Sequence, residues 1–209
     1  MTADLIVIAK EPVAGRVKTR LTPPYTPREA AELATAALRD TLTTVLGTFA
    51  ERRVLALAGH PGDWLPEGFT VVAQRGDGLD ERLANAFDDA YAGRPLVLIG
   101  MDTPQVTPEL LASAGRALRT HDAVFGPAAD GGFWLLGLVR PNPALLRGVP
   151  MSRPGTGRLQ LDRLRQAGLS VATMPELTDV DTAADVADVA GLAPDGLFAA
   201  TARLLGVPA

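Results

Sequence analysis

Residues 97–104, VLIGMDTP, decide the fold: an apolar run ends at an aspartate, and a proline follows two residues later. Such a run is typical of a strand that is covered on both faces, as the strands of parallel sheets are. Ligands of open α/β sheets bind outside the carboxyl ends of the strands, so Asp102 is placed where a divalent metal and phosphates would lie. The alternative is a turn aspartate that bonds its own backbone before Pro104.

Composition narrows the class of protein. The chain has 209 residues, 47% hydrophobic and 21% charged, which suits one globular domain over residues 1–209. A net charge of −4 argues against a nucleic-acid partner, and the absence of cysteine excludes disulfides, thiolate metal sites and cysteine nucleophiles. No apolar stretch approaches the roughly 20 residues that span a bilayer, and no signal-peptide cleavage pattern is present. We therefore expect a cytoplasmic protein with no membrane partner; a homo-oligomer is left open.

Strand and helix signals alternate along the chain. Thr26 to Glu29 form a capping box with proline at the first helical position, which predicts a long helix to about residue 49. Further helices are predicted at 78–92, 108–119 and 157–167, and a short one follows residue 182. Strands are predicted at 5–9, 53–59, 69–73, 95–101, 123–127, 133–139 and 169–174. This alternation predicts an α/β fold, a Rossmann-like three-layer sandwich with a mostly parallel mixed sheet and the site at its carboxyl edge.

A basic, glycine-bearing loop at residues 10–21 follows the first predicted strand. Its cations Arg16, Lys18 and Arg20 alternate, so in an extended loop they lie on one side and could clamp a polyphosphate. The spacing is neither that of a Walker A loop nor that of the dinucleotide-binding glycine fingerprint. A solvated basic loop is the alternative.

Residues 74–82 connect a predicted strand to a predicted helix. The glycines allow close approach of the backbone to a ligand, and Gln74 could make paired hydrogen bonds to a base edge. A glycine-rich hairpin or helix cap is an equally good interpretation.

Two acidic segments follow later strands. Asp130, Gly131 and Gly132 form a tight turn or a site in which the carboxylate meets a hydroxyl or a metal. Asp179 and Asp181 lie on the same side if the chain is extended there. Clustered carboxylates are costly unless a cation or hydrogen-bond donors satisfy them, and a metal shared by Asp102 and one of this pair would do so. The sequence does not rank the two.

Five segments of the chain can be compared with known families: KEPVAGRVKTRL (10–21), QRGDGLDERL (74–83), IGMDTP (99–104), GPAADGGFWLLGL (126–138) and DVDTAADV (179–186). In this order they resemble the DUF2064 proteins, a branch of the GT-A, or nucleotide-diphospho-sugar transferase, superfamily. The resemblance runs from about residue 4 to residue 190, and the family is similar to 2-phospholactate guanylyltransferases and molybdenum-cofactor nucleotidyltransferases.

The resemblance implies a mononucleotide bound by the N-terminal half and a metal held at Asp102 and near Asp181. Together with the basic loop it favours a Mg²⁺- or Mn²⁺-dependent nucleotidyltransferase, which joins the NMP of a GTP-like NTP to a small phosphorylated acceptor and releases pyrophosphate. A glycosyltransferase with a nucleotide-sugar donor and a non-catalytic nucleotide-binding domain are the alternatives. Both enzymes would be transferases.

The expected site residues fall into four groups. Catalysis is expected from Lys18, Arg16 and Asp102. Nucleotide binding is expected from Ala9, Lys10, Gly15, Arg20, Gln74 and Gly78, with the loop cations at the departing pyrophosphate. Acceptor binding is expected from Asp130, Gly131, Gly132 and Arg153, and metal binding from Asp102, Asp181 and Asp179.

Overall fold

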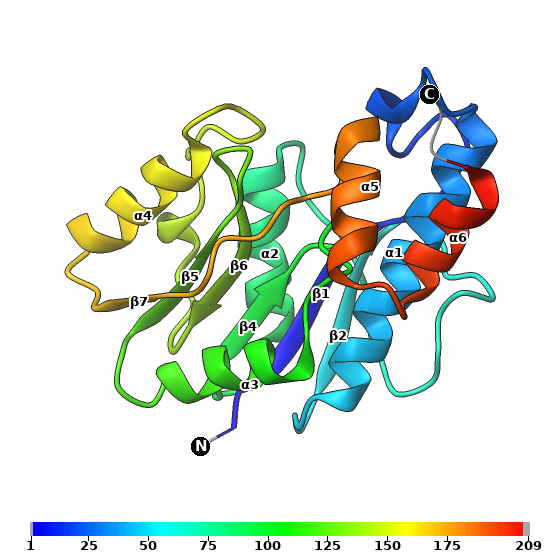
Figure 1. Cartoon of the computed structure of the whole chain (residues 1–209). Helices are drawn as coiled ribbons and strands as arrows, with labels where there is room; N and C mark the ends of the chain where they lie inside the picture. The colour runs from blue at the N-terminus through cyan, green and yellow to red at the C-terminus, as the bar shows by residue number, and fades with distance from the viewer. Residues whose placement is uncertain (1, 207–209) are drawn as a thin grey trace.

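The first apolar run becomes strand β1 (Asp4–Lys10) within a seven-stranded sheet of the computed structural model, which describes residues 2–206 (Figure 1). The strand order is β3-β2-β1-β4-β6-β5-β7, and in the described sheet β6 alone runs antiparallel to its neighbours. The remaining strands are β2 (Arg53–Ala58), β3 (Thr70–Ala73), β4 (Leu96–Ile99), β5 (Ala123–Pro127), β6 (Phe133–Leu138) and β7 (Val171–Thr173). The predicted mostly parallel mixed sheet is confirmed.

Helices cover both faces of this sheet because successive side chains of β1 point to opposite sides. Val7 is buried in the core with α1 (Pro27–Gly47) and α3 (Pro108–Ala117). Ile6 is buried in the other core with α2 (Leu79–Ala90) and α4 (Thr156–Gln166). The apolar run therefore has two buried faces, and the predicted α/β/α sandwich is confirmed.

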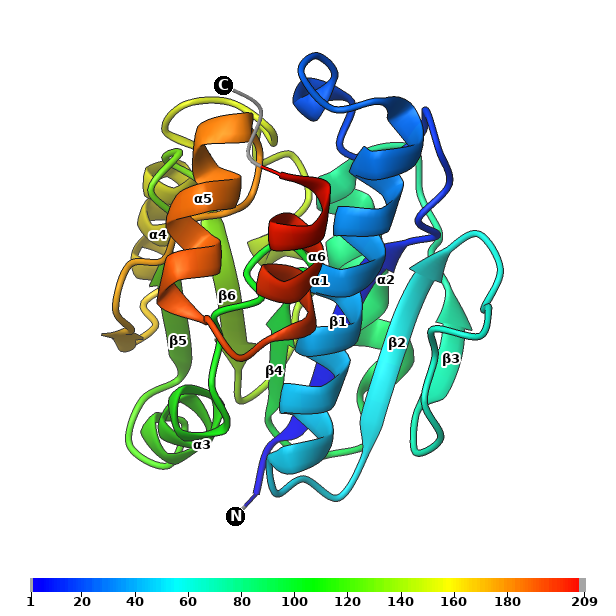
Figure 2. The same cartoon turned by 45° about the vertical axis from the view of Figure 1, so that its right-hand side comes forward.

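Two C-terminal helices pack beside α1 (Figure 2). They are α5 (Ala183–Leu192) and α6 (Leu197–Leu205), and with α1 they bury Tyr25, Val186 and Phe198. No signal in the sequence analysis predicted α6. Its first amides donate to the carboxylate of Asp40, from Leu197 N at 2.9 Å and from Phe198 N at 2.8 Å. Two short 3-10 helices, η1 (Thr19–Leu21) and η2 (Pro143–Leu145), complete the elements of the described chain.

The helix starts agree with the local signals. Thr26 and Glu29 form the predicted capping box of α1, and Thr107 accepts a hydrogen bond from the Leu110 amide at the start of α3. None of the helices among residues 2–206 has the length and apolar composition that crossing a membrane requires.

Candidate active site

A cleft of about 920 Å³ lies at the carboxyl ends of β1, β3, β4 and β5, where the sequence predicted the site. Its acidic lining residues are Asp102, Asp130, Asp179, Asp181 and Asp185, and its cationic ones are Lys10, Arg16, Lys18, Arg20, Arg82 and Arg153. Most of the predicted site residues are thus brought together. Among these, Gly15, Gly78 and Gly131 are not lining residues.

Those three glycines shape the backbone around the cleft. Gly15 lies in the basic loop at a φ of 75°, and Gly78 caps the N-terminus of α2. Gly131 has a φ of 86°, and its carbonyl accepts a hydrogen bond from the Gly157 amide at 2.8 Å. Because a Cβ at Gly157 would come within 2.2 Å of the Gly132 carbonyl oxygen, the turn packs directly on the start of α4.

An ion-pair cluster lies at the centre of the cleft. The Lys18 ammonium is 2.5 Å from Asp102 Oδ1 and 3.7 Å from Asp181 Oδ1, and it also donates a hydrogen bond to the carbonyl of Val180. Arg20 Nη1 is 2.9 Å from Asp181 Oδ2. The Lys18 side chain is only 7% exposed, whereas Asp102 and Asp181 are 40% and 35% exposed. A single cation position therefore joins two of the predicted metal ligands.

The prediction that the basic loop is extended is wrong. Lys18 has left-handed backbone angles, φ 48° and ψ 38°, and the next residues form η1. Local turns therefore replace the alternation that was expected to align the three cations. Arg16, Lys18 and Arg20 still line the same cleft, but Lys18 and Arg20 are directed to carboxylates.

The acidic segment after residue 178 is not a strand either. The Val180 amide donates to the Asp102 carbonyl at 2.9 Å, which fixes this segment against the end of β4. The oxygen Oδ1 of Asp179 is buried without a hydrogen-bond partner. Burial first, and then the negative charges of Asp102 and Asp130, raise the pKa of Asp179 from 3.8 to about 7.

The donor chemistry at this point fits a hard divalent cation. Asp102, Asp179 and Asp181 offer only oxygen ligands, which suit Mg²⁺ and Mn²⁺, and Oδ1 of Asp179 has no hydrogen-bond donor. No three His, Cys, Asp or Glu side chains of residues 2–206 are already arranged around one point as metal ligands. Lys18 supplies the positive charge between two of these carboxylates instead.

A third prediction, that Gln74 makes paired hydrogen bonds to a base edge, is also wrong. Its Nε2 donates to the Ala9 carbonyl at 2.8 Å and to the Ala56 carbonyl at 2.9 Å. Both amide protons are therefore used by the backbone, and only the oxygen Oε1 is left for a ligand. The predicted paired hydrogen bonds to a base edge are not available in this arrangement.

The turn interpretation of Asp130 is confirmed, and its role in a site stays a prediction. Asp130 Oδ1 accepts a hydrogen bond from the Gly132 amide at 2.8 Å, as in a turn, and both residues line the cleft. Arg153 faces the same cleft from the loop before α4.

Sequence reasoning missed Arg82 and Asp185. Arg82 lies one turn inside α2, and its guanidinium donates to the carbonyls of Gly76 and Asp77 at 3.0 and 3.4 Å. Asp185 accepts hydrogen bonds from the amides of Asp181 and Thr182, at 3.0 and 2.6 Å, and so orients the Asp181 segment. The T-x-x-D pattern at 182–185 was the available signal for Asp185.

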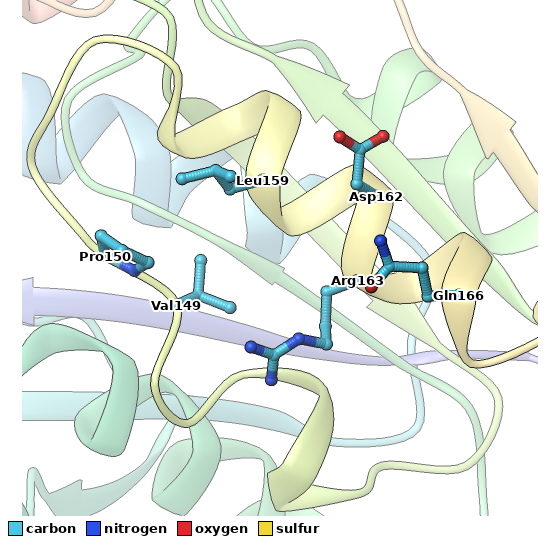
Figure 3. Close-up of a pocket in the computed structure, with 6 residues that line it drawn as sticks. All are labelled: Val149, Pro150, Leu159, Asp162, Arg163 and Gln166. Carbon is cyan, nitrogen blue, oxygen red and sulfur yellow. The ribbon is translucent and has the colours of Figure 1, made fainter.

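A second, smaller pocket of about 170 Å³ lies beside α4 and shares no lining residue with the cleft (Figure 3). Its one cation, Arg163, donates to the carbonyls of Ala144 and Arg147. The residues that line it are Val149, Pro150, Leu159, Asp162, Arg163 and Gln166. None of the sequence segments singled out above contributes to this pocket.

Comparison with known structures shows the fold class: the chain has the fold of the nucleotide-diphospho-sugar transferases. A structure from Desulfovibrio desulfuricans G20, described as a candidate nucleotide-diphospho-sugar transferase, is 30% identical with a TM-score of 0.77, over 88% of this chain and 84% of that one. The chain belongs to the family of uncharacterized proteins conserved in bacteria known as DUF2064, whose model matches residues 32–153. The resemblance found in the sequence is confirmed.

More distant structures share the fold. CMP:2-keto-3-deoxy-manno-octonic acid synthetase, complexed with CTP, is 15% identical with a TM-score of 0.59, over 93% of this chain and 99% of that one. Rv0371c of Mycobacterium tuberculosis H37Rv, in complex with manganese, is 20% identical with a TM-score of 0.53, over 90% and 98% of the two chains. No curated protein matches the chain.

Proposed function

We propose that this protein is a divalent-metal-dependent nucleotidyltransferase, a single GT-A-like domain that transfers the NMP of an NTP to a small phosphorylated acceptor. The observation that carries the proposal is the separation of charge in the cleft. Lys10, Arg16 and Arg82 belong to the N-terminal half and form no ion pair with a described carboxylate, whereas the acidic cluster belongs to the segments after β4. Unpaired cations beside an acidic cluster that could hold a metal suit a polyphosphate.

The phosphates would lie across the ends of β1 and β4. Arg16 and Arg20 approach from the basic loop and Arg82 from α2, so they can neutralise the β- and γ-phosphates as pyrophosphate leaves. Lys18 can act as a point charge on the same group once it is released from its carboxylates.

The metal would be held by Asp102 and Asp181, with Asp179 as the third oxygen donor. When bound there, it would supply Lewis-acid polarisation of the α-phosphate and charge neutralisation. Cytosine is the base in one distant structural relative, the CTP complex, and the Mycobacterium protein binds manganese; each supports a nucleotide–metal site in this fold.

The acceptor would lie over the second half of the cleft. Arg153 is a cation without a described ion pair there, and it suits a phosphate or another acidic group of the acceptor. Asp130 and Gly132 would contact the rest of the molecule. An ionised phosphate oxygen of the acceptor forms the new bond to the α-phosphorus while the bond between the α-phosphorus and the bridging oxygen breaks, and no general base is required.

The alternative is glycosyl transfer, which the description of the Desulfovibrio protein favours. The test incubates the protein and Mg²⁺ with each NTP and a panel of phosphorylated acids and sugar phosphates, and follows pyrophosphate. Parallel reactions contain UDP- and GDP-sugars with the same acceptors. Acceptor-dependent pyrophosphate release supports the proposal; consumption of nucleotide sugar with acceptor glycosylation and no pyrophosphate refutes it.

A further inference from the structure

The Lys18 ammonium stands where a shared divalent cation would bind. It contacts Asp102 and Asp181 together, at 2.5 and 3.7 Å, and its side chain is almost fully buried. A buried ammonium needs such counter-charges, because the charge is expensive to remove from water without them. The two carboxylates thus form a cation site that the chain fills with its own side chain.

Two parts of the chain hold Lys18 in this position: its neighbours in the basic loop and the segment around Val180. Val17 and Leu21 on either side are buried, and the Lys18 carbonyl accepts a hydrogen bond from the Leu21 amide at 2.9 Å. The Val180 carbonyl accepts a bond from the ammonium, and the Val180 amide is bonded to Asp102. The contact is therefore part of the packed structure around the cleft and not a mobile surface pair.

We propose that Lys18 competes with the divalent metal for Asp102 and Asp181, so that the metal enters together with the nucleotide and binds weakly before it. This inference rests on the metal site of the proposed function. A divalent ion and an ammonium repel one another at such short range, so metal entry requires Lys18 to leave. A triphosphate supplies the anionic group that can receive Lys18, and without it the displaced ammonium has no comparable partner.

The test measures binding of Mn²⁺ alone, with no nucleotide, by the loss of the free-ion signal in electron paramagnetic resonance. Lys18→Met removes the ammonium and keeps the length of the side chain. Lys10→Met is the matched control, because Lys10 is the other lysine of the chain, lines the same cleft and pairs with no described carboxylate. Both variants change the net charge equally.

Lys18→Met is expected to bind Mn²⁺ about 10-fold more tightly than the wild type, which equals about 1.4 kcal/mol, while Lys10→Met stays within about 3-fold. Unchanged or weaker binding by Lys18→Met overturns the inference, as does an equal gain in both variants, which would be a general effect of charge. If Lys18→Met does not fold, Lys18→Gln and Lys18→Arg replace it: Gln must tighten Mn²⁺ binding relative to Arg, and equal affinities refute the competition.

The metal measurement is independent of the reaction. Tighter Mn²⁺ binding by Lys18→Met without any pyrophosphate release by the wild type would support the competition and reject nucleotidyl transfer. Pyrophosphate release by the wild type, with unchanged Mn²⁺ affinity in Lys18→Met, would support nucleotidyl transfer and reject the competition.

Discussion

Replacing Asp179 by asparagine should alter how the stability of the fold depends on pH. Asp179 is largely buried beside the cleft, and its Oδ1 has no hydrogen-bond partner. The negative charges of Asp102, Asp130 and Asp181 face it, and Lys18 is the cation that opposes them. Asparagine has the same shape but remains uncharged at every pH, so the variant isolates the effect of ionisation.

Burial is the main reason that the native pKa of Asp179 is about 7, against 3.8 for the ordinary carboxyl. Since the native state binds this proton more tightly than the unfolded chain, protonation of Asp179 stabilises the fold at acidic pH. That stabilisation declines as the pH rises from about 4 to about 7 and is then gone. A shift of this size corresponds to roughly 4 kcal/mol in all, of which a wild-type scan from pH 5 to 8 would capture about 2–3 kcal/mol.

The assay is urea unfolding at pH 5, 6, 7 and 8 without divalent metal. Asp179→Asn should be more stable than the wild type at pH 8, by about 1–3 kcal/mol after allowing for an incompletely bonded amide, and its stability should vary less with pH. Asp188→Asn, at an exposed position of α5, is the matched control and should follow the wild-type pH profile. If Asp179→Asn retains the wild-type dependence between pH 5 and 8, the reasoning about burial is refuted.

Four other variants test three separate parts of the structure. Asp102→Asn should lower kcat/KM for the Mg²⁺-dependent reaction by about 100-fold or more, with the melting temperature changed by only a few degrees; steady-state kinetics with full activity would contradict its role. Arg16→Ala should weaken NTP binding about 10-fold and NMP binding much less, with a smaller effect for Arg20→Ala because Arg20 already pairs with Asp181. If calorimetry finds equal losses of affinity for NTP and NMP, the loop cations do not contact the outer phosphates. Asp40→Ala should lower the free energy of unfolding by about 1–2 kcal/mol, since two amides at the start of α6 lose their acceptor; an unchanged urea midpoint would argue against that cap.

Much of the fold could be predicted because its signals are local. The capping box at Thr26 and the proline after it define the start of α1, and the apolar run of β1 indicates a strand with two covered faces. Strand β5 matches its predicted range, 123–127. Local hydrogen bonding and side-chain periodicity determine these elements, so nearby residues contain the needed information.

Helix α6 could not be predicted in this way. Its N-cap residue, Gly196, offers no side-chain acceptor, and the acceptor comes from Asp40 of α1, far away in the sequence. The space at Gly196 shows the same dependence, because a Cβ there would lie 2.7 Å from the Asp40 carboxylate. Tertiary packing therefore supplies the start signal of this helix.

Many of the residues that line the cleft could be predicted from the sequence, whereas Arg82, Asp185 and the pairing of the side chains could not. Strand ends identify Asp102 and Gln74, since the carboxyl edge of the sheet gathers them whatever the loop conformations are. The contact between Lys18 and Asp102 depends on the left-handed backbone of Lys18, and that of Gln74 with Ala9 depends on the register of neighbouring strands. Such angles and distances arise only after the loops have packed.

The charge of the cleft bears on the choice between the two transferase reactions. Six cationic and five acidic side chains line it, an excess of one positive charge. A metal–triphosphate complex carries about two negative charges more than a metal–nucleotide-sugar complex. A cleft with this excess gains electrostatic energy from the first ligand and little from the second. Because metal entry leaves Lys18 without its carboxylates, the additional phosphate charge also provides its new partner, and this is why we favour an NTP as the substrate.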